Sequence, residues 1–255
     1  MRKIIVFDMD GVLVDVRPSY RATVIKTIDE YCKEKDIHIH DNNVSPELID
    51  KLKLQSGFND DWILTHHLLS ERGIIVRFDE VKRRFEEIFL GTENFKRLYK
   101  EKPRYHFFKE GMIDCEKPIA TIDFLRRVAK QAEIALATGR NESEALYTLQ
   151  KFDFTPFFKT RITMYEIPSD KRKPHPYSLV EVVKRLGNNP APDQCYYIGD
   201  IPDDITAAGR AKEYYPFKSV GLLEATGDPI ETRQAMQQAG ADFIIDKLED
   251  LLEVL

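Results

Sequence analysis

The sequence has few cysteines and no long apolar run. Its three cysteines, Cys32, Cys115 and Cys195, lie far apart and form no CxxC pair. An odd number of widely spaced thiols is typical of a reducing compartment and argues against a disulfide framework, so we expect a cytoplasmic protein. No stretch approaches the roughly 18 apolar residues that a membrane-spanning helix needs, so we expect no membrane partner.

The sequence also has no excess of basic residues. It contains 38 Lys and Arg against 43 Asp and Glu, which gives a formal charge of −5 at pH 7. Proteins that bind nucleic acid regardless of its sequence usually have a basic surface, so we expect no nucleic-acid partner. No GxGxxG or GxxxxGK[S/T] string occurs, and the common glycine-rich nucleotide-binding loops are therefore not indicated.

Five short apolar runs are present instead. They read IIVF at 4–7, IALA at 134–137, YYIG at 196–199, SVGL at 219–222 and FII at 243–245. Continuous apolar runs of this length are typical of parallel strands buried between two layers of helices, and helical patterns separate them along the chain. We therefore predict an α/β fold with a doubly wound, Rossmann-like parallel sheet.

One interval interrupts the alternation of strands and helices. From about residue 17 to residue 108 the apolar spacing is helical, as for Phe85 and Phe89, and no convincing strand occurs. We predict an all-helical cap domain over 17–108, inserted directly after the first strand. The α/β core domain would then consist of 1–16 and 109–255.

Two carboxylates follow the first apolar run, in the segment FDMDGVLVD at residues 7–15. Asp8 and Asp10 stand one residue apart before a glycine, although acidic residues suit the interior of a strand poorly. In open α/β sheets, ligands bind beyond the carboxyl ends of the strands. We therefore expect both carboxylates to face a ligand site at that edge of the sheet.

Two other runs end in polar residues at the same edge. IALA leads into TGR, so the Thr138 hydroxyl stands at a strand end, and Asn141 then caps a helix whose N-terminus favours an anion. YYIG leads into DIPDD, which puts Asp200 at the strand end with Asp203 and Asp204 close behind. The strand ends thus gather further acids and a hydroxyl.

Lys173 would join them from the loop KRKPHP, which Pro174 and Pro176 stiffen. Several acids on one edge repel each other, and each raises the pKa of its neighbours. A bound divalent cation would relieve this repulsion, and a hard, oxygen-rich site favours Mg²⁺.

The segments DMDGVLVD, TGR, KP and GDIPDD, in this order, resemble the four signature motifs of the haloacid dehalogenase superfamily. The resemblance covers roughly residues 1–15 and 110–255. The helical insertion stands where that family has its C1-type caps, as in phosphoglycolate phosphatases and β-phosphoglucomutases. The resemblance implies a Mg²⁺-dependent phosphatase acting on a small phosphorylated metabolite. The dehalogenases proper lack an acid at the position of Asp10, and its presence favours phosphoryl transfer over carbon–halogen cleavage.

The resemblance also implies a role for each motif residue. Asp8 would be the nucleophile that forms an aspartyl-phosphate, and Asp10 would protonate the leaving oxygen and then activate water. Thr138, Gly139 and Lys173 would bind the phosphoryl group, and Lys173 would also offset the charge near Asp8. The implied metal ligands are Asp8, Asp10, Asp200 and Asp204, with Asp203 open as an alternative to Asp204.

Two other functions stay open at this point. A phosphomutase would pass the phosphoryl group from the aspartate to a second hydroxyl instead of water. A non-catalytic phosphometabolite-binding protein would need neither the nucleophile nor the general acid, so Asp8 and Asp10 weigh against it. The sequence leaves open whether the protein is a monomer or a homodimer.

Four residues are candidates for contact with the substrate beyond its phosphoryl group: Arg17, Arg21, Asn59 and Arg140. Arg17 and Arg21 stand one helical turn apart and could meet a second anionic group, or they could be a surface pair. Asn59 could equally cap the helix that begins in NDDW. Arg140 could instead pair with a glutamate of the following helix.

Overall fold

The computed structural model describes residues 1–255 except 37–43, 56–57, 59, 107 and 188. The chain divides into two compact units: one combines Met1–Asp15 with Pro118–Leu255, and the other is Val16–Lys117. The second boundary falls at Pro118, further along the chain than the expected residue 109.

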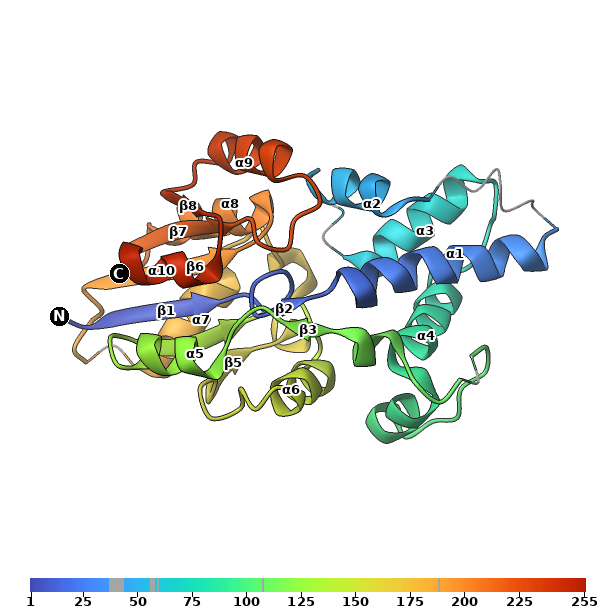
Figure 1. The fold of residues 1–255 in the computed structure, drawn as a ribbon, viewed down its shortest axis with the longest axis horizontal. Helices are drawn as coiled ribbons and strands as arrows, with labels where there is room; N and C mark the ends of the chain where they lie inside the picture. The colour runs from blue at the N-terminus through green and yellow to red at the C-terminus, as the bar shows by residue number, and fades with distance from the viewer. Residues whose placement is uncertain (37–43, 56–57, 59, 107, 188) are drawn as a thin grey trace. The chain divides into compact units, whose positions relative to one another are not determined.

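The first unit is built on a six-stranded parallel sheet with the order β5-β4-β1-β6-β7-β8 (Figure 1). The strands are β1 (Lys3–Phe7), β4 (Glu133–Ala137), β5 (Thr160–Ile162), β6 (Gln194–Gly199), β7 (Phe217–Leu222) and β8 (Phe243–Ile245). All five predicted strands are confirmed, and the sequence missed β5. Two further strands, β2 (Val14–Asp15) and β3 (Lys117–Pro118), form a two-stranded sheet.

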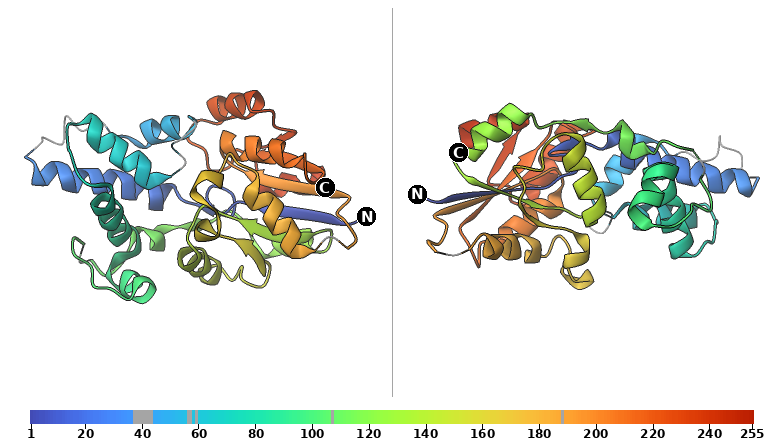
Figure 2. Two further views of the ribbon diagram at one scale, coloured as in Figure 1. Left: turned by 180° about the vertical axis from the view of Figure 1, so that it is seen from behind. Right: turned by 90° about the horizontal axis from the view of Figure 1, so that it is seen from below.

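Helices cover both faces of the parallel sheet (Figure 2). They are α5 (Ile122–Ala129), α6 (Glu142–Lys151), α7 (Tyr177–Leu186), α8 (Pro202–Ala211), α9 (Pro229–Gln238) and α10 (Leu251–Val254). Successive residues of β1 point to opposite faces, as the period of a strand requires. Ile4 and Val6 pack with Leu179 of α7, while Phe7 makes an edge-to-face contact with Phe124 of α5, with ring centroids 6.3 Å apart. The predicted doubly wound α/β fold is thus confirmed.

The second unit is helical. It contains the turn η1 (Arg17–Arg21), the helices α1 (Ala22–Glu34), α2 (Pro46–Lys53), α3 (Asp61–Glu71) and α4 (Phe78–Tyr99), and the short turn η3 (Met112–Cys115). Its core includes a stack of aromatic rings, in which the centroid of Tyr20 lies 4.2 Å from that of Phe89. The side chain of Asp60 accepts hydrogen bonds from the amides of Trp62 and Ile63, so Asp60 is the N-cap of α3. Asn59, which the sequence also offers as that cap, lies outside the described residues.

Helix α4 changes direction at Gly91, where the backbone has φ 69° and ψ 168°. A Cβ atom at this position would lie 2.4 Å from the backbone nitrogen of Gly111 and from the carbonyl carbon of Glu110. Only glycine allows both the positive φ and this approach of two backbone segments.

Within the described part of the chain, no helix is both long enough and apolar enough to cross a membrane. The cytoplasmic location expected from the cysteines stays a prediction.

Candidate active site

Three neighbouring strands of the parallel sheet end side by side in polar residues. β1 lies between β4 and β6, and Phe7, its last residue, is in register with Leu136 on one side and Ile198 on the other. Asp8, Thr138 and Asp200 directly follow the ends of β1, β4 and β6. The buried apolar runs therefore fix these three polar residues at one edge of the sheet, where parallel sheets bind their ligands.

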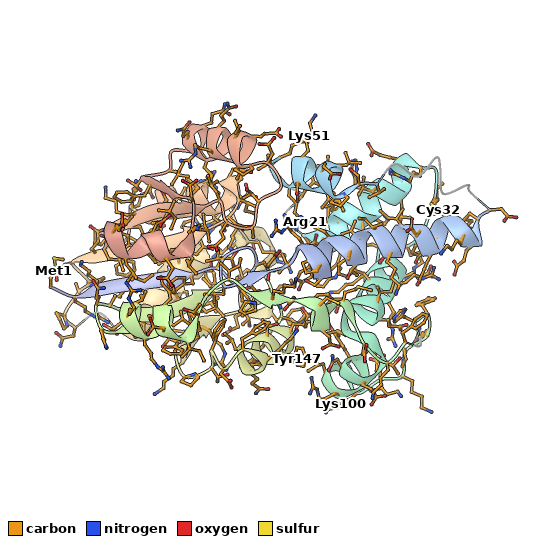
Figure 3. The ribbon with its side chains drawn as sticks, viewed as in Figure 1. Met1, Arg21, Cys32, Lys51, Lys100 and Tyr147 are labelled. Atoms are coloured by element: carbon orange, nitrogen blue, oxygen red, sulfur yellow. The ribbon has the colours of Figure 1, made fainter. Side chains whose placement is uncertain are left out.

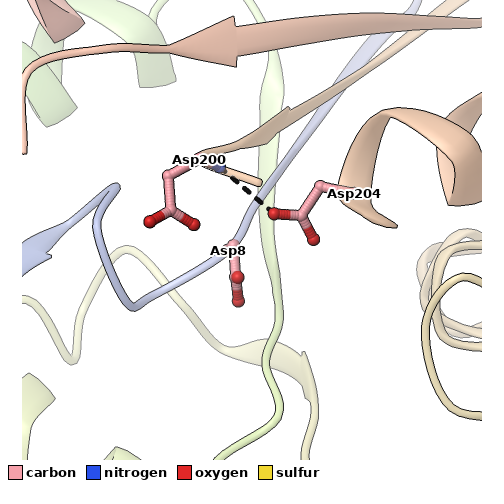
Figure 4. Close-up of side chains that lie close together, drawn as sticks. All are labelled: Asp8, Asp200 and Asp204. Atoms are coloured by element: carbon pink, nitrogen blue, oxygen red, sulfur yellow. Dashed lines mark hydrogen bonds between the residues drawn. The ribbon is translucent and has the colours of Figure 1, made fainter. Parts of the chain in front are cut away.

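Three carboxylates meet at this edge, those of Asp8, Asp200 and Asp204 (Figure 4). One oxygen from each lies within 4.8 Å of the others. Asp8 and Asp204 are buried, and Asp200 is half-buried. Asp203 lies in the first turn of α8 and does not belong to this cluster, so the geometry selects Asp204 as the acid that accompanies Asp200.

Two glycines let these carboxylates approach the backbone. Gly11 has φ +69°, and a Cβ on it would lie 1.9 Å from Oδ2 of Asp200. A Cβ on Gly199 would lie 2.2 Å from the side chain of Asp204. Side chains at either position would displace an acid of the cluster.

Lys173 bridges two of the acids. Its Nζ lies 2.8 Å from Oδ2 of Asp8 and 2.8 Å from Oδ1 of Asp204. Burial alone would lower the pKa of this amine, but the charges of Asp204 and Asp8 outweigh it and hold the pKa well above its usual value. Lys173 is therefore a fixed positive charge in contact with Asp8.

The two carboxylate oxygens of Asp204 contact four neighbouring groups. Oδ1 accepts from the Tyr197 hydroxyl at 3.1 Å and faces Lys173, while Oδ2 accepts the amides of Asp200 at 3.1 Å and Ile201 at 3.4 Å. Its side chain is fully buried. Asp204 thus orients Lys173 and the start of the turn that carries Asp200.

The carboxylate of Asp8, in contrast, has one oxygen that no described residue hydrogen-bonds. Its Oδ1 is buried and has no hydrogen-bond partner among the described residues, while Oδ2 faces Lys173. Burial first, and then the charges of Asp204 and Asp10, raise the pKa of Asp8 to about 7, although Lys173 opposes them. A buried carboxylate oxygen without a partner is costly unless a cation or another ligand meets it.

The turn after β4 holds Thr138 and Gly139. Thr138 is buried, and its Oγ1 accepts the amide of Arg140 at 3.2 Å, which leaves the hydroxyl proton for another acceptor. Gly139 is exposed, and a Cβ there would meet no atom within 4 Å. Asn141 caps α6 by accepting the amide of Glu144 at 3.0 Å, as its position before the helix predicts.

Asp10 does not join the cluster of three acids. Its Oδ1 accepts a hydrogen bond from Nε of Arg140 at 2.6 Å, and Nη1 of the same guanidinium lies 2.6 Å from Oγ1 of Thr148. Arg140, a candidate for substrate contact, is thus buried beside Asp10 and helix α6.

The remaining substrate-contact candidates belong to the helical unit. Arg21 is buried there in an ion pair with Asp50 (Arg21 is labelled in Figure 3), and Arg17 is exposed in η1. Asn59 lies outside the described residues. Substrate contact by these three residues stays a prediction.

Two residues of the site escaped the sequence analysis, Tyr197 and Thr148. Tyr197 lies in the predicted strand YYIG, and burial together with the charges of Asp204 and Asp8 raises the pKa of its hydroxyl well above the usual value, so it remains a donor. A tyrosine hydroxyl within a buried strand requires a hydrogen-bond partner, and this requirement is the signal that could have pointed to Tyr197.

Comparison with known proteins shows the family. A family model for haloacid dehalogenase-like hydrolases matches residues 2–212, so the chain belongs to that family. The predicted family and the prediction of a hydrolytic enzyme are both confirmed.

Relatives with similar sequences include a phosphatase. The chain is 26% identical over 256 residues to the phosphorylated carbohydrates phosphatase of Thermotoga maritima, covering 98% of this chain and 97% of that protein. It is 25% identical over 269 residues to the imidazoleglycerol-phosphate dehydratase of Phytophthora nicotianae, with 98% of this chain covered but only 52% of that longer protein.

The fold is also found among solved structures. The phosphatase Tt82 from Thermococcus thioreducens superimposes with a TM-score of 0.64 at 22% sequence identity, over 92% of this chain and 99% of that one. At this level of identity, the likeness establishes the shared fold.

Proposed function

We propose that the chain is a Mg²⁺-dependent phosphatase that hydrolyses a small phosphorylated metabolite through an aspartyl-phosphate on Asp8. The observation that carries the proposal is the buried Oδ1 of Asp8, which has no partner among the described residues although it lies in a cluster with Asp200 and beside Lys173. Among relatives of this chain, the protein from Thermotoga maritima is named a phosphatase of phosphorylated carbohydrates.

The acids fit a hard divalent cation. Asp8 and Asp200 each bring a carboxylate oxygen to the cluster, and Mg²⁺ typically takes one or two carboxylates together with water and substrate oxygens. Asp204, whose oxygens are already hydrogen-bonded, would keep Asp200 and Lys173 in place. Asp10, which was expected to bind the metal, is assigned to proton transfer instead. The ion would supply positive charge that neutralises the phosphoryl oxygens as the bonds to phosphorus change.

The chain's own groups account for the bonds and the protons that change in a two-step reaction, with the cation bound. A carboxylate oxygen of Asp8 attacks phosphorus, the bond from phosphorus to the leaving oxygen breaks, and Asp10 gives that oxygen its proton. Asp10 then accepts a proton from a water molecule, whose oxygen attacks phosphorus and releases Asp8 and inorganic phosphate. The amine of Lys173 and the hydroxyl of Thr138 would bind the phosphoryl oxygens during both steps.

The proposal is tested by phosphate release from a panel of phosphorylated sugars, acids and amino-alcohols, with and without Mg²⁺. We expect turnover that a chelator abolishes, and a loss of at least about 10³-fold in Asp8→Asn, because the amide cannot act as the nucleophile. The matched control is Asp203→Asn, which removes an acid near the cluster but outside it. Wild-type turnover of an aryl phosphate by Asp8→Asn would disprove the assignment of the nucleophile.

A phosphomutase would use the same Asp8 and Asp10, so the site supports it as the alternative. The two reactions differ in the second acceptor, which is water for the phosphatase and a substrate hydroxyl for the mutase. Dependence on a bisphosphate activator, with isomerised product and no net release of phosphate, would identify the mutase.

A further inference from the structure

The guanidinium of Arg140 links the proposed general acid to helix α6. Nε donates to Oδ1 of Asp10 and Nη1 to Oγ1 of Thr148, both at 2.6 Å. The side chain of Arg140 has no exposed surface, whereas that of Asp10 is 32% exposed. The fully buried guanidinium of Arg140 thus contacts the partly exposed carboxylate of Asp10 from the interior of the protein.

The backbone of Arg140 is held as well. Its amide donates to Oγ1 of Thr138 at 3.2 Å, and its carbonyl accepts the amide of Met164 at 2.8 Å. The residue that meets Asp10 is therefore hydrogen-bonded to the threonine proposed to bind phosphate. A movement of the β4 turn would move both groups together.

The geometry leaves the second oxygen of Asp10 outside the ion pair. Nε contacts Oδ1, and the planar guanidinium reaches Thr148 with another nitrogen, so its orientation is fixed at both ends. A lysine carries its charge on one freely rotating ammonium and lacks the rigid planar fork that fixes this orientation. The carboxylate is therefore held with Oδ1 toward Arg140, and this contact does not use Oδ2.

We propose that Arg140 is a positioning residue for proton transfer: it fixes the carboxylate of Asp10 so that Oδ2 meets the leaving oxygen, and Thr148 anchors it. This inference rests on the proposed phosphatase function. Arg140 keeps all its protons, and the proton that reaches the leaving oxygen comes from Oδ2 of Asp10. The candidate role in direct substrate contact is thereby replaced by a role that acts through Asp10.

The experiment compares leaving groups in Arg140→Lys. p-Nitrophenol leaves without protonation, while an alkyl alcohol needs its proton, and general acid catalysis typically contributes about 10²- to 10⁴-fold. For Arg140→Lys we expect kcat/KM to fall by about 10²-fold with an alkyl phosphate and by no more than about threefold with p-nitrophenyl phosphate. A solely structural role would lower both rates by the same factor, and that result would overturn the inference.

A double-mutant comparison shows whether Arg140 acts through Asp10. With the alkyl phosphate, Asp10→Asn combined with Arg140→Lys should be no slower than Asp10→Asn alone, because the second change removes support from a group already lost. Additive losses would contradict the proposal.

Thr148→Val provides a second variant of nearly the same shape, should Arg140→Lys fail to fold. It removes the hydrogen bond from Nη1 and leaves the contact with Asp10, so we expect a smaller loss, about three- to tenfold, again confined to the alkyl phosphate. An equal loss with both substrates would refute the proposal. If the wild-type protein released phosphate from neither substrate, the proposed function itself would fail. Wild-type turnover with leaving-group dependence in Asp10→Asn alone would overturn only the role of Arg140.

Discussion

At the scale of single residues, the site contains a buried carboxylate, Asp8, whose charge its neighbours offset only in part. Lys173 neutralises one oxygen of Asp8, and Asp204 is satisfied by four groups, but Oδ1 of Asp8 keeps no partner among the described residues. Such an arrangement lowers the stability of the free protein and favours a bound cation or phosphoryl group. Charge burial of this kind is common where function and stability compete.

Because this carboxylate is buried, we predict that Asp8→Asn is more stable than the wild type, by an amount that depends on pH. Folding raises the pKa of Asp8 from 3.8 to about 7, mainly through burial, so the ionised carboxylate destabilises the folded state. The penalty is absent below about pH 4, grows between about pH 4 and 7, and reaches at most about 4 kcal/mol above pH 7. In the presence of a chelator, Asp8→Asn should therefore have a higher thermal midpoint than the wild type at pH 8, with the difference shrinking toward pH 5.

The measurement is a thermal unfolding series from pH 5 to pH 8, repeated with Mg²⁺. The cation should raise the midpoint of the wild type more than that of Asp8→Asn, because only the wild type carries the Asp8 carboxylate, whose charge Lys173 offsets in part. A difference between the two proteins that does not change with pH would contradict the electrostatic account of Asp8.

At the scale of secondary-structure elements, the sequence predicts the strands that form apolar runs and misses a strand that does not. β1, β4, β6 and β7 lie inside the sheet and appear as apolar runs because helices cover both of their faces. β8 is an edge strand, but its residues Phe243–Ile245 are all apolar and therefore reveal it. β5 is an edge strand of only three residues, and its Thr160 and Arg161 are half-buried, so no apolar run reveals it.

The sequence also does not determine which residue caps a helix or which side chains pair. Asn59, Asp60 and Asp61 all have side chains that can cap a helix, and only the backbone geometry selects Asp60. The motif order predicted the gathering of Asp8, Asp200 and Asp204, but the direction of the Arg140 side chain toward Asp10 depends on rotamers and packing. The pairing of Arg140 has no sequence pattern of its own, and the buried-strand position of Tyr197 indicates only that its hydroxyl needs a partner.

The kink of α4 at Gly91 predicts that a side chain at this position destabilises the protein. Gly91→Ala would bring a Cβ within 2.4 Å of the backbone at Glu110 and Gly111 while forcing a positive φ on alanine. We expect a loss of about 2 kcal/mol or more in the free energy of unfolding, measured by chemical denaturation.

The control is Gly209→Ala in α8, where an added Cβ meets no atom within 4 Å. Alanine there should be neutral or stabilise by up to about 1 kcal/mol, because it reduces the freedom of the unfolded chain. Equal effects of the two substitutions would mean that the backbone contact at Gly91 does not determine the stability of the helical unit.

At the scale of the whole molecule, the chain divides its tasks between two compact units. The α/β unit alone contains the clustered acids, Lys173, Thr138 and the pair of Asp10 with Arg140. The proposed chemistry of phosphorus therefore needs only residues of that unit. The helical unit, which interrupts the α/β unit in sequence, is where we expect contacts that select the substrate.

The central claim, attack of Asp8 on phosphorus, has one direct measurement. Turnover is quenched in the steady state with Mg²⁺ and substrate present, the protein is reduced with borohydride, and its peptides are analysed by mass spectrometry. Borohydride reduces an aspartyl-phosphate to homoserine, so the account predicts homoserine at position 8, and its absence from Asp8→Asn. Homoserine at another aspartate, or none at any position despite continued release of phosphate and efficient reduction in a control acyl phosphate, would contradict the account.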